Sequence, residues 1–325
     1  MPAFSVDRIG VIFSRRWLSL VLLISWAIWL TVPASAEELS LPELRGDSLV
    51  GRIQTVLVRP GESLLDIARA FDIGHDQIIG ANPSINRWVP EPGTRVIIPS
   101  RYILPSGPRS GIVLNLGELR MYYYPPNTRA VWTFPVSIGD FDWETPIGTT
   151  RIIAKEREPA WSPPASIRAE HAAESEPLPT VIPGGDPDNP LGHYAFRLGI
   201  KGYLIHGTDE RRSYGIGMRV SHGCIRMYPE DIAFLFEHVK VGTQVRIINE
   251  PVKYGTEFNA QFIEIHQVID SDFEQLATEE IFNLALQLIE AYSPSREDIN
   301  PRALARSAIL ATGIPARISF DREYN

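Results

Sequence analysis

The chain contains one cysteine, Cys224, among 325 residues. Its N-terminus has the pattern of an export signal, and an exported protein with one thiol cannot close an internal disulfide. The remaining roles for Cys224 are a buried apolar side chain, a metal ligand, an intermolecular link or a nucleophile. Two histidines and an arginine lie close to Cys224 in the sequence, and Gly223 directly precedes it. This neighbourhood favours the nucleophile.

The N-terminal segment predicts a secretory signal over residues 1–36. Arg8, Arg15 and Arg16 provide the positive charge, and residues 17–30 form an uncharged, mostly apolar run. That run is shorter than the roughly 20 residues of a membrane-spanning helix. Small residues at 34–36 complete a cleavage site, so we expect cleavage near Ala36 and export to the periplasm. An uncleaved membrane anchor is the alternative.

Composition limits the class of protein. The net charge of −8 at pH 7 disfavours nucleic acid as a partner, because nucleic acid requires a basic surface. A hydrophobic content of 44% is typical of a globular protein. The 27 prolines and 24 glycines predict many turns in a β-rich fold. The length suits one large domain or two modest ones.

Residues 53–99 predict a small module that follows a polar linker over residues 37–52. The expected order is a strand (53–58), two helices (62–71 and 76–81) and a strand (95–98). The module resembles a LysM domain, which implies binding of glycans that contain N-acetylglucosamine, such as peptidoglycan strands. A degenerate spacer is the alternative, and the stretch 84–91, with Trp88, departs from the family. The resemblance is carried by Val58, Pro60–Leu64, Ile67, Ala68, Phe71, Ile78, Asn82, Pro92, Gly93, Val96, Ile98 and Pro99.

Residues 100–109 predict a second linker, and strands alternate with turns beyond it. The long segment 156–192 is rich in proline and low in periodicity, which indicates a lid or binding loop. Apolar positions at helical spacing predict one helix over 229–240. The expected strands span 112–116, 119–124, 130–138, 151–155, 194–198, 203–205 and 244–248.

The C-terminal extension, residues 251–325, carries no motif with a known function. Residues 251–267 predict a strand pair. Ser271 and Glu274 form a capping-box pattern, so we expect a helix from there to about Tyr292. A last helix should begin at Asn300-Pro301.

The residues around Cys224 match the needs of acyl transfer by a thiol. A free thiol is a few per cent ionised at pH 7, and a neighbouring imidazolium lowers its pKa. His206 and His222 are the candidates for that base, and His206 is favoured because His222 lies within the turn itself. The backbone N–H groups of Gly223 and Cys224 are candidate oxyanion donors. The planar guanidinium of Arg226 suits a carboxylate.

Other roles for these residues are open at this point. His206, His222 and Cys224 offer three zinc ligands, the number in a catalytic zinc site. A buried structural cysteine is a further alternative, and Arg226 alone fits a structural ion pair nearly as well as substrate binding. Ser221 lacks the G-x-S-x-G context of a serine nucleophile.

The motif His206-Gly207-Thr208, followed by Ser221-His222-Gly223-Cys224-x-Arg226, resembles the signature of L,D-transpeptidases with a YkuD-type catalytic domain. Segments 135–139, 145–149 and 187–192 also match, so the resemblance covers about residues 110–250. It implies a mainly β fold, a sandwich of mixed sheets with one packed helix, beside the α+β accessory module. The residues it implies are Cys224 as nucleophile, His206 as base, His222, Gly223 and Cys224 as the oxyanion site, and Arg226, Ser221, Gly207 and Thr208 in substrate binding.

The resemblance also implies a reaction. Cys224 would attack the third residue of a peptidoglycan tetrapeptide stem and form a thioester, without a metal or organic cofactor. An amine would then accept the acyl group, giving a 3-3 cross-link or attaching an outer-membrane lipoprotein to the cell wall. The alternatives are an L,D-carboxypeptidase or amidohydrolase of the same bond, and a non-catalytic peptidoglycan-binding protein.

Overall fold

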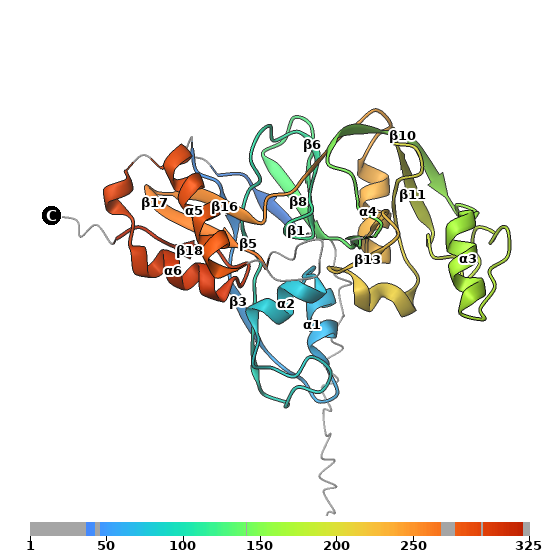
Figure 1. The fold of residues 1–325 in the computed structure, drawn as a ribbon, viewed down its shortest axis with the longest axis horizontal. Helices are drawn as coiled ribbons and strands as arrows, with labels where there is room; N and C mark the ends of the chain where they lie inside the picture. The colour runs from blue at the N-terminus through green and yellow to red at the C-terminus, as the bar shows by residue number, and fades with distance from the viewer. Residues whose placement is uncertain (1–36, 43–45, 141, 268–276, 294, 321–325) are drawn as a thin grey trace, which may run out of the picture. The chain divides into compact units, whose positions relative to one another are not determined.

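The computed structural model describes residues 37–42, 46–140, 142–267, 277–293 and 295–320 (Figure 1). The chain divides into two compact units, Met1–Val32 and Pro33–Asn325, and all described residues belong to the second. The predicted signal segment and the capping-box pair Ser271 and Glu274 lie outside the described residues. Within the described part of the chain, no helix is long and apolar enough to cross a membrane.

The N-terminal module has the predicted βααβ order. Strand β3 (Gln54–Leu57) pairs antiparallel with β4 (Arg95–Ile98), and helices α1 (Leu64–Ala70) and α2 (His75–Ala81) lie between them in sequence. Ser63 caps α1, because its hydroxyl accepts from the Asp66 N–H while the Asp66 carboxylate accepts from the Ser63 N–H. The apolar residues at helical spacing form the core of the module with Val58, Val96 and Ile98.

A nine-stranded mixed sheet forms the body of the following region, in the order β1-β8-β7-β6-β15-β10-β11-β12-β14. Strands β6 and β15 pair in parallel, as do β12 and β14, and the other neighbours are antiparallel. The predicted mainly β fold with a mixed sheet is therefore confirmed. The strands are β1 (Glu37–Ser40), β6 (Gly111–Asn115), β7 (Arg120–Tyr124), β8 (Ala130–Pro135), β10 (Gly148–Arg157), β11 (Tyr194–Leu198), β12 (Leu204–His206), β14 (Ile225–Arg226) and β15 (Gln244–Ile248).

The predicted helix over 229–240 is present as α4 (Pro229–His238). Its apolar face, Ile232, Leu235 and Phe236, is buried in the same core as the sheet residues. Strand β13 (Arg219–Ser221) and the 3-10 helix η1 (Glu210–Gly215) precede Cys224 in the sequence. Strand β13 pairs in parallel with the short strand β9 (Ile138–Gly139).

Both predicted linkers are wrong. Residues 37–52 contain β1, which pairs with β8, and β2 (Leu49–Gly51), which pairs with β5 (Arg101–Ile103) from the second expected linker. Strand β1 has four residues, and β2 and β5 have three each. Their apolar side chains, Leu39 and Val50 among them, are buried with Tyr102 and Leu104. Short polar sequences of this kind become strands because partners distant in the sequence pair with them.

The C-terminal extension has a core of its own. The predicted strand pair is present as β16 (Val252–Glu257) and β17 (Ala260–Ile265), and β18 (Ala316–Arg317) joins β17. The remaining elements are α5 (Thr278–Tyr292), η2 (Arg296–Asp298) and α6 (Pro301–Leu310). Helix α5 ends where predicted, and the Asn300 side chain caps α6 by accepting from the N–H groups of Arg302 and Ala303.

Candidate active site

Parallel pairing of β12 and β14 brings the two motifs together. His206 is the last residue of β12 and lies opposite Arg226 in the register. Cys224 directly precedes β14, one position before Ile225, which pairs with Ile205 of β12. His206 and Cys224 both line one cavity of about 600 Å³, which we call the Cys224 cavity. The predicted convergence of His206 and Cys224 through the fold is therefore present.

A hydrogen bond within the turn stabilises the conformation around Cys224. The buried Ser221 hydroxyl donates to the Cys224 carbonyl at 2.5 Å, which closes the turn across three residues. Gly223 has a φ of +97°, a conformation that favours glycine. A Cβ at this position would lie 2.9 Å from Cε1 of Tyr203. The structure thus places Ser221 as a residue that holds the turn and shows why glycine stands beside the thiol.

Thr145 is a site residue to which sequence reasoning gave no role. Its hydroxyl accepts from the Gly139 N–H at 3.0 Å and donates to the Gly223 carbonyl at 2.8 Å. The buried side chain therefore joins β9 to the turn before Cys224. The only sequence signal was its place in the family motif at 145–149.

His206 is buried and neutral. Its Nδ1 lies 2.6 Å from the Gly207 carbonyl, and since a carbonyl only accepts, Nδ1 carries the proton and Nε2 the lone pair. Burial first, and the charge of Arg226 second, lower the pKa of His206 to about 3, although the carbonyls of Gly207 and Leu191 act the other way. A neutral imidazole with a free lone pair is equipped to accept a proton.

The surroundings of Cys224 also favour its neutral form over the expected thiolate. Burial raises the pKa of Cys224, and the Leu204 backbone and the charge of Arg226 oppose that rise without overcoming it. An imidazolium with a pKa near 3 does not exist at neutral pH, so it cannot hold a thiolate. The Cys224 Sγ also lies 3.7 Å from the Gly202 carbonyl, an acceptor suited to an S–H group. Burial thus favours the neutral form of both side chains.

His222 lines the same cavity, but its ring has contacts of its own. Its Nε2 lies 3.0 Å from a carboxylate oxygen of Glu170, and its ring packs edge-on against Trp143 with centroids 5.3 Å apart. Glu170 belongs to α3 (Ala165–Ala173), a helix inside the segment 156–192 that was expected to be irregular. The ring of His222 is thus engaged by Glu170 and Trp143, whereas Nε2 of His206 is left to act as a base.

Arg226 fits substrate binding better than an ion pair. No carboxylate of a described residue lies within the 4.0 Å of a salt bridge to its guanidinium, and its buried Nε has no hydrogen-bond partner. The buried hydroxyl of Thr208 likewise lacks a partner among the described residues. Gly207 is packed tightly, since a Cβ there would lie 3.0 Å from Ile232. Buried polar groups without hydrogen-bond partners cost stability, which indicates that a ligand supplies the missing partners.

Residues of the segment 156–192 form part of the wall of the Cys224 cavity. A second cavity of about 570 Å³, the lid cavity, adjoins it beneath the same segment. The base of the segment is closed by Asn189, whose Nδ2 donates to the Pro159 and Pro183 carbonyls. The residues that line both cavities are Trp161, Ile167, Pro190, His222 and Arg226.

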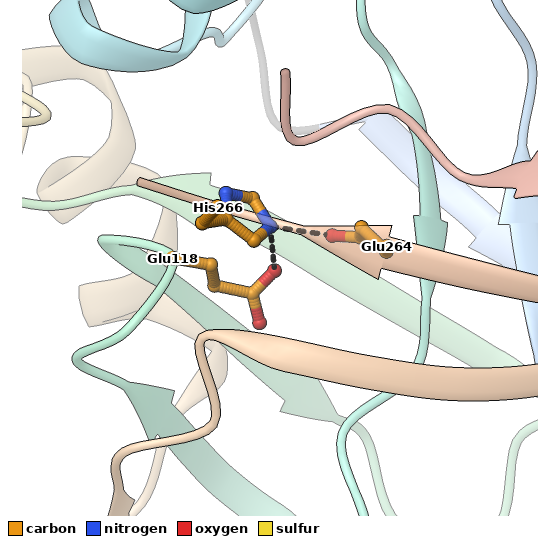
Figure 2. Close-up of side chains that lie close together, drawn as sticks. All are labelled: Glu118, Glu264 and His266. Carbon is orange, nitrogen blue, oxygen red and sulfur yellow. Dashed lines mark hydrogen bonds and ion pairs between the residues drawn. The ribbon is translucent and has the colours of Figure 1, made fainter. Parts of the chain in front are cut away.

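The zinc alternative finds no support in the geometry. Among the described residues, the one group of three His, Cys, Asp or Glu ligand atoms within 4.8 Å of each other is Glu118, Glu264 and His266, far from Cys224 in sequence (Figure 2). A cation already serves that group, because Nζ of Lys253 lies 2.6 Å from Glu118 and 2.9 Å from Glu264. We call these four residues the carboxylate–lysine cluster.

Two family models match the chain. A model of the L,D-transpeptidase catalytic domain, YkuD, matches residues 109–247, and a model of the LysM domain matches residues 56–99. The probable L,D-transpeptidase YbiS of Escherichia coli K12 is 39% identical over 290 residues, which span 88% of this chain and 93% of YbiS. The chain belongs to the L,D-transpeptidase family. The LysM and catalytic domains together imply peptidoglycan binding.

Other members of the L,D-transpeptidase family have comparable sequence identity to this chain. The probable L,D-transpeptidase YcfS of E. coli K12 is 42% identical over 80% of this chain and 81% of its own length. The probable L,D-transpeptidase ErfK/SrfK of Salmonella typhimurium is 35% identical over 85% and 90%. A solved L,D-transpeptidase from Mycobacterium smegmatis is 19% identical and covers 64% of this chain and 98% of its own. Its TM-score of 0.34 is too low to support any argument.

Proposed function

We propose that the chain is a cysteine-dependent L,D-transpeptidase that acts on peptidoglycan tetrapeptide stems through a thioester on Cys224. The observation that carries the proposal is the meeting of Cys224 and His206 at one cavity, which Arg226 also lines without a salt bridge to any described residue. These are a nucleophile, a base and a carboxylate-binding group in one place.

The first step forms the thioester. The thiol proton moves to Nε2 of His206 as Cys224 Sγ attacks the carbonyl carbon of the third stem residue. The negative charge on the carbonyl oxygen faces the backbone N–H groups of the turn at 222–224, which lies outside the strands. The C–N bond then breaks, and His206 returns the proton to the departing amine of D-alanine.

The second step transfers the acyl group. An incoming amine attacks the thioester, loses a proton to His206, and the C–S bond breaks to give a new peptide bond and the thiol. The energy of the first peptide bond is kept in the thioester, so no ATP is needed. The acceptor is the side-chain amine of another stem, giving a 3-3 cross-link, or a lysine of an outer-membrane lipoprotein.

Two adjoining cavities support transfer over hydrolysis. A transferase accommodates a donor and an acceptor, whereas a hydrolase needs room for one peptide and water. The Cys224 cavity and the lid cavity are each about 600 Å³ or slightly less, and both reach Arg226 and His222. One cavity therefore suits the donor stem and the other the amine.

We also propose the setting of the reaction. Residues 1–36 act as a signal that is cleaved near Ala36, and the mature chain works in the periplasm, where peptidoglycan lies. The domain limits predicted above, with the LysM domain over 53–99, the catalytic domain over 110–250 and an extension over 251–325, belong to the same proposal. N-terminal sequencing of the protein from fractionated cells tests the cleavage and the location.

The test of the reaction is intact-protein mass spectrometry after mixing with a tetrapeptide donor. We expect an acyl adduct on Cys224 that disappears when an amine acceptor is added and a cross-linked product appears. Cys224→Ala should give neither adduct nor product while remaining folded. Turnover by Cys224→Ala would overturn the proposal, and tripeptide as the sole product in the presence of the amine would assign a carboxypeptidase.

A further inference from the structure

The LysM domain packs directly on the stretch of chain that carries Cys224. This stretch, residues 210–230, is here called the nucleophile segment. It runs from η1 through β13, the Cys224 turn and β14 to the first turn of α4. Helix α1 of the LysM domain contacts it at both ends, and helix α2 contacts it between them (Figure 1).

Arg69 of α1 joins the two ends of the nucleophile segment. Its guanidinium donates to both carboxylate oxygens of Glu230, at 2.7 and 2.8 Å, on the first turn of α4. It also donates to both oxygens of Glu210, at 2.6 and 3.2 Å, on η1. The hydrogen bond from Arg69 lowers the pKa of Glu210, and the two carboxylates raise that of Arg69. Paired charged hydrogen bonds of this type are strong and directional.

The backbone of α2 holds the middle of the same segment. The N–H groups of His75 and Asp76 donate to the carbonyls of Ile216 and Gly217, at 2.8 and 3.3 Å. The approach is so close that a Cβ on Gly217 would lie 2.4 Å from the Cα of Gly74. The LysM domain therefore fixes the residues just before β13, and with them the path of the chain into the Cys224 turn.

A LysM domain that only tethered the enzyme to glycan strands would need none of these contacts. A domain that only holds the enzyme to glycan strands works through a flexible linker, and its removal raises KM for the polymer alone. Here β14 has two residues and β13 three, so these strands alone supply few hydrogen bonds to position Cys224. A displacement of a reacting atom by about 1 Å can cost about 10²-fold in rate.

We propose that Arg69 is a positioning residue for the transpeptidase reaction, and that the LysM domain sets the turnover rate as well as the capture of glycan. Arg69 acts by clamping Glu210 to Glu230 across the nucleophile segment. The inference rests on the proposed role of Cys224. It predicts an effect of a LysM residue on a substrate that contains no sugar.

The experiment measures kcat and KM of the full chain with a sugar-free tetrapeptide donor and a small amine acceptor. For Arg69→Ala we expect kcat to fall by about 10- to 100-fold, with KM within about twofold. Arg69→Lys keeps the charge but loses the fork, so its kcat should lie between those of Arg69→Ala and the parent. The matched control is Arg59→Ala, since Arg59 pairs only with Glu62 of the same domain.

Glu210→Gln gives a second route, because its side chain is 72% exposed and its loss does not threaten the core. It should lower kcat in the parent and add little in the Arg69→Ala background. An Arg69→Ala or Glu210→Gln variant that is folded and matches the parent kcat on the sugar-free donor would overturn the inference. Absence of any adduct on Cys224 in the parent chain would instead overturn the proposed function.

Discussion

The Cys224 site and the carboxylate–lysine cluster are both buried and both rich in ionisable groups, yet they differ in how those groups are satisfied. In the cluster, Lys253 contacts Glu118, Glu264 and the Ile103 carbonyl, and His266 lies 2.7 Å from Glu264. Burial opposes the charge on Lys253, but the two carboxylates outweigh it and raise its pKa. Every charge there has a partner.

At the Cys224 site the polar groups lack such partners. Among the described residues, Nε of Arg226 has no hydrogen-bond partner, and Nε2 of His206 keeps its lone pair. A closed network of charges stabilises a fold, whereas an open one is held in place by its surroundings and is completed by substrate. The difference separates structural from chemical use of similar residues, and it gives predictions of opposite kind for the two regions.

The largest effect is expected from His206→Ala. Turnover should fall by about 10²–10⁴-fold, because the thiol loses the base that accepts its proton. Folding should be retained, since a neutral buried ring without a charge partner is being removed. Steady-state kinetics and a thermal melt on the same sample check both statements. A mild loss here, together with an inactive His222→Ala, would exchange the roles of the two histidines.

Lys253→Met should show the reverse pattern. The change leaves Glu118 and Glu264 buried side by side without their cation, which typically costs about 3–5 kcal/mol of unfolding free energy. Turnover per folded molecule should stay unchanged, because the cluster does not reach the cavities at Cys224. Urea unfolding followed by kinetics below the transition checks this. A large kcat loss in folded protein would mean that the two regions are coupled.

Removal of both carboxylates offers the control for that experiment. A variant with Glu118→Gln, Glu264→Gln and Lys253→Met has no buried charge left in the cluster except what His266 carries. It should recover part of the stability lost in Lys253→Met alone, since the penalty comes from unpaired charge.

The sequence predicted the site better than it predicted the outer strands. The motif named both His206 and Cys224, although their approach depends on the fold, and both residues line the Cys224 cavity. Strands β1 and β2 were missed because isolated apolar residues such as Leu39 and Leu49 become buried only through partners far along the chain. Helix α3 was missed because Ile167 is its one buried residue, so no apolar periodicity marks it.

Protonation states were beyond the sequence for a different reason. The proximity of a histidine to a cysteine suggests an ion pair, and only burial decides against it. His206 is 3% exposed, and the cost of charging it there exceeds what the backbone carbonyls return. Thr145 was likewise hidden, because its two hydrogen bonds join segments that are distant in sequence.

Thr145→Val should have a smaller effect than the first two changes. It leaves the Gly139 N–H and the Gly223 carbonyl without partners, at a cost of about 1–3 kcal/mol each at most. Turnover should fall by about tenfold as the turn loosens. Thr128→Val is the control, since Thr128 is exposed and makes only local contacts. Equal kcat for both variants would remove Thr145 from the site.

The smallest expected effect concerns the pH at which the Cys224 thiol ionises. The pKa of Cys224 is raised, so its alkylation by iodoacetamide should be slow at pH 7 and still increase as the pH passes 9. His206→Ala should leave this profile unchanged, because no imidazolium is present to be lost. Turnover of the parent chain should show no step from His206 between pH 5 and 8, since the ring is neutral above a pKa of about 3. A plateau in the alkylation rate below pH 7 that His206→Ala abolishes would instead establish a thiolate–imidazolium pair. The Cys224 site would then hold a closed pair of charges, as the carboxylate–lysine cluster does, and the contrast between the two regions would be wrong.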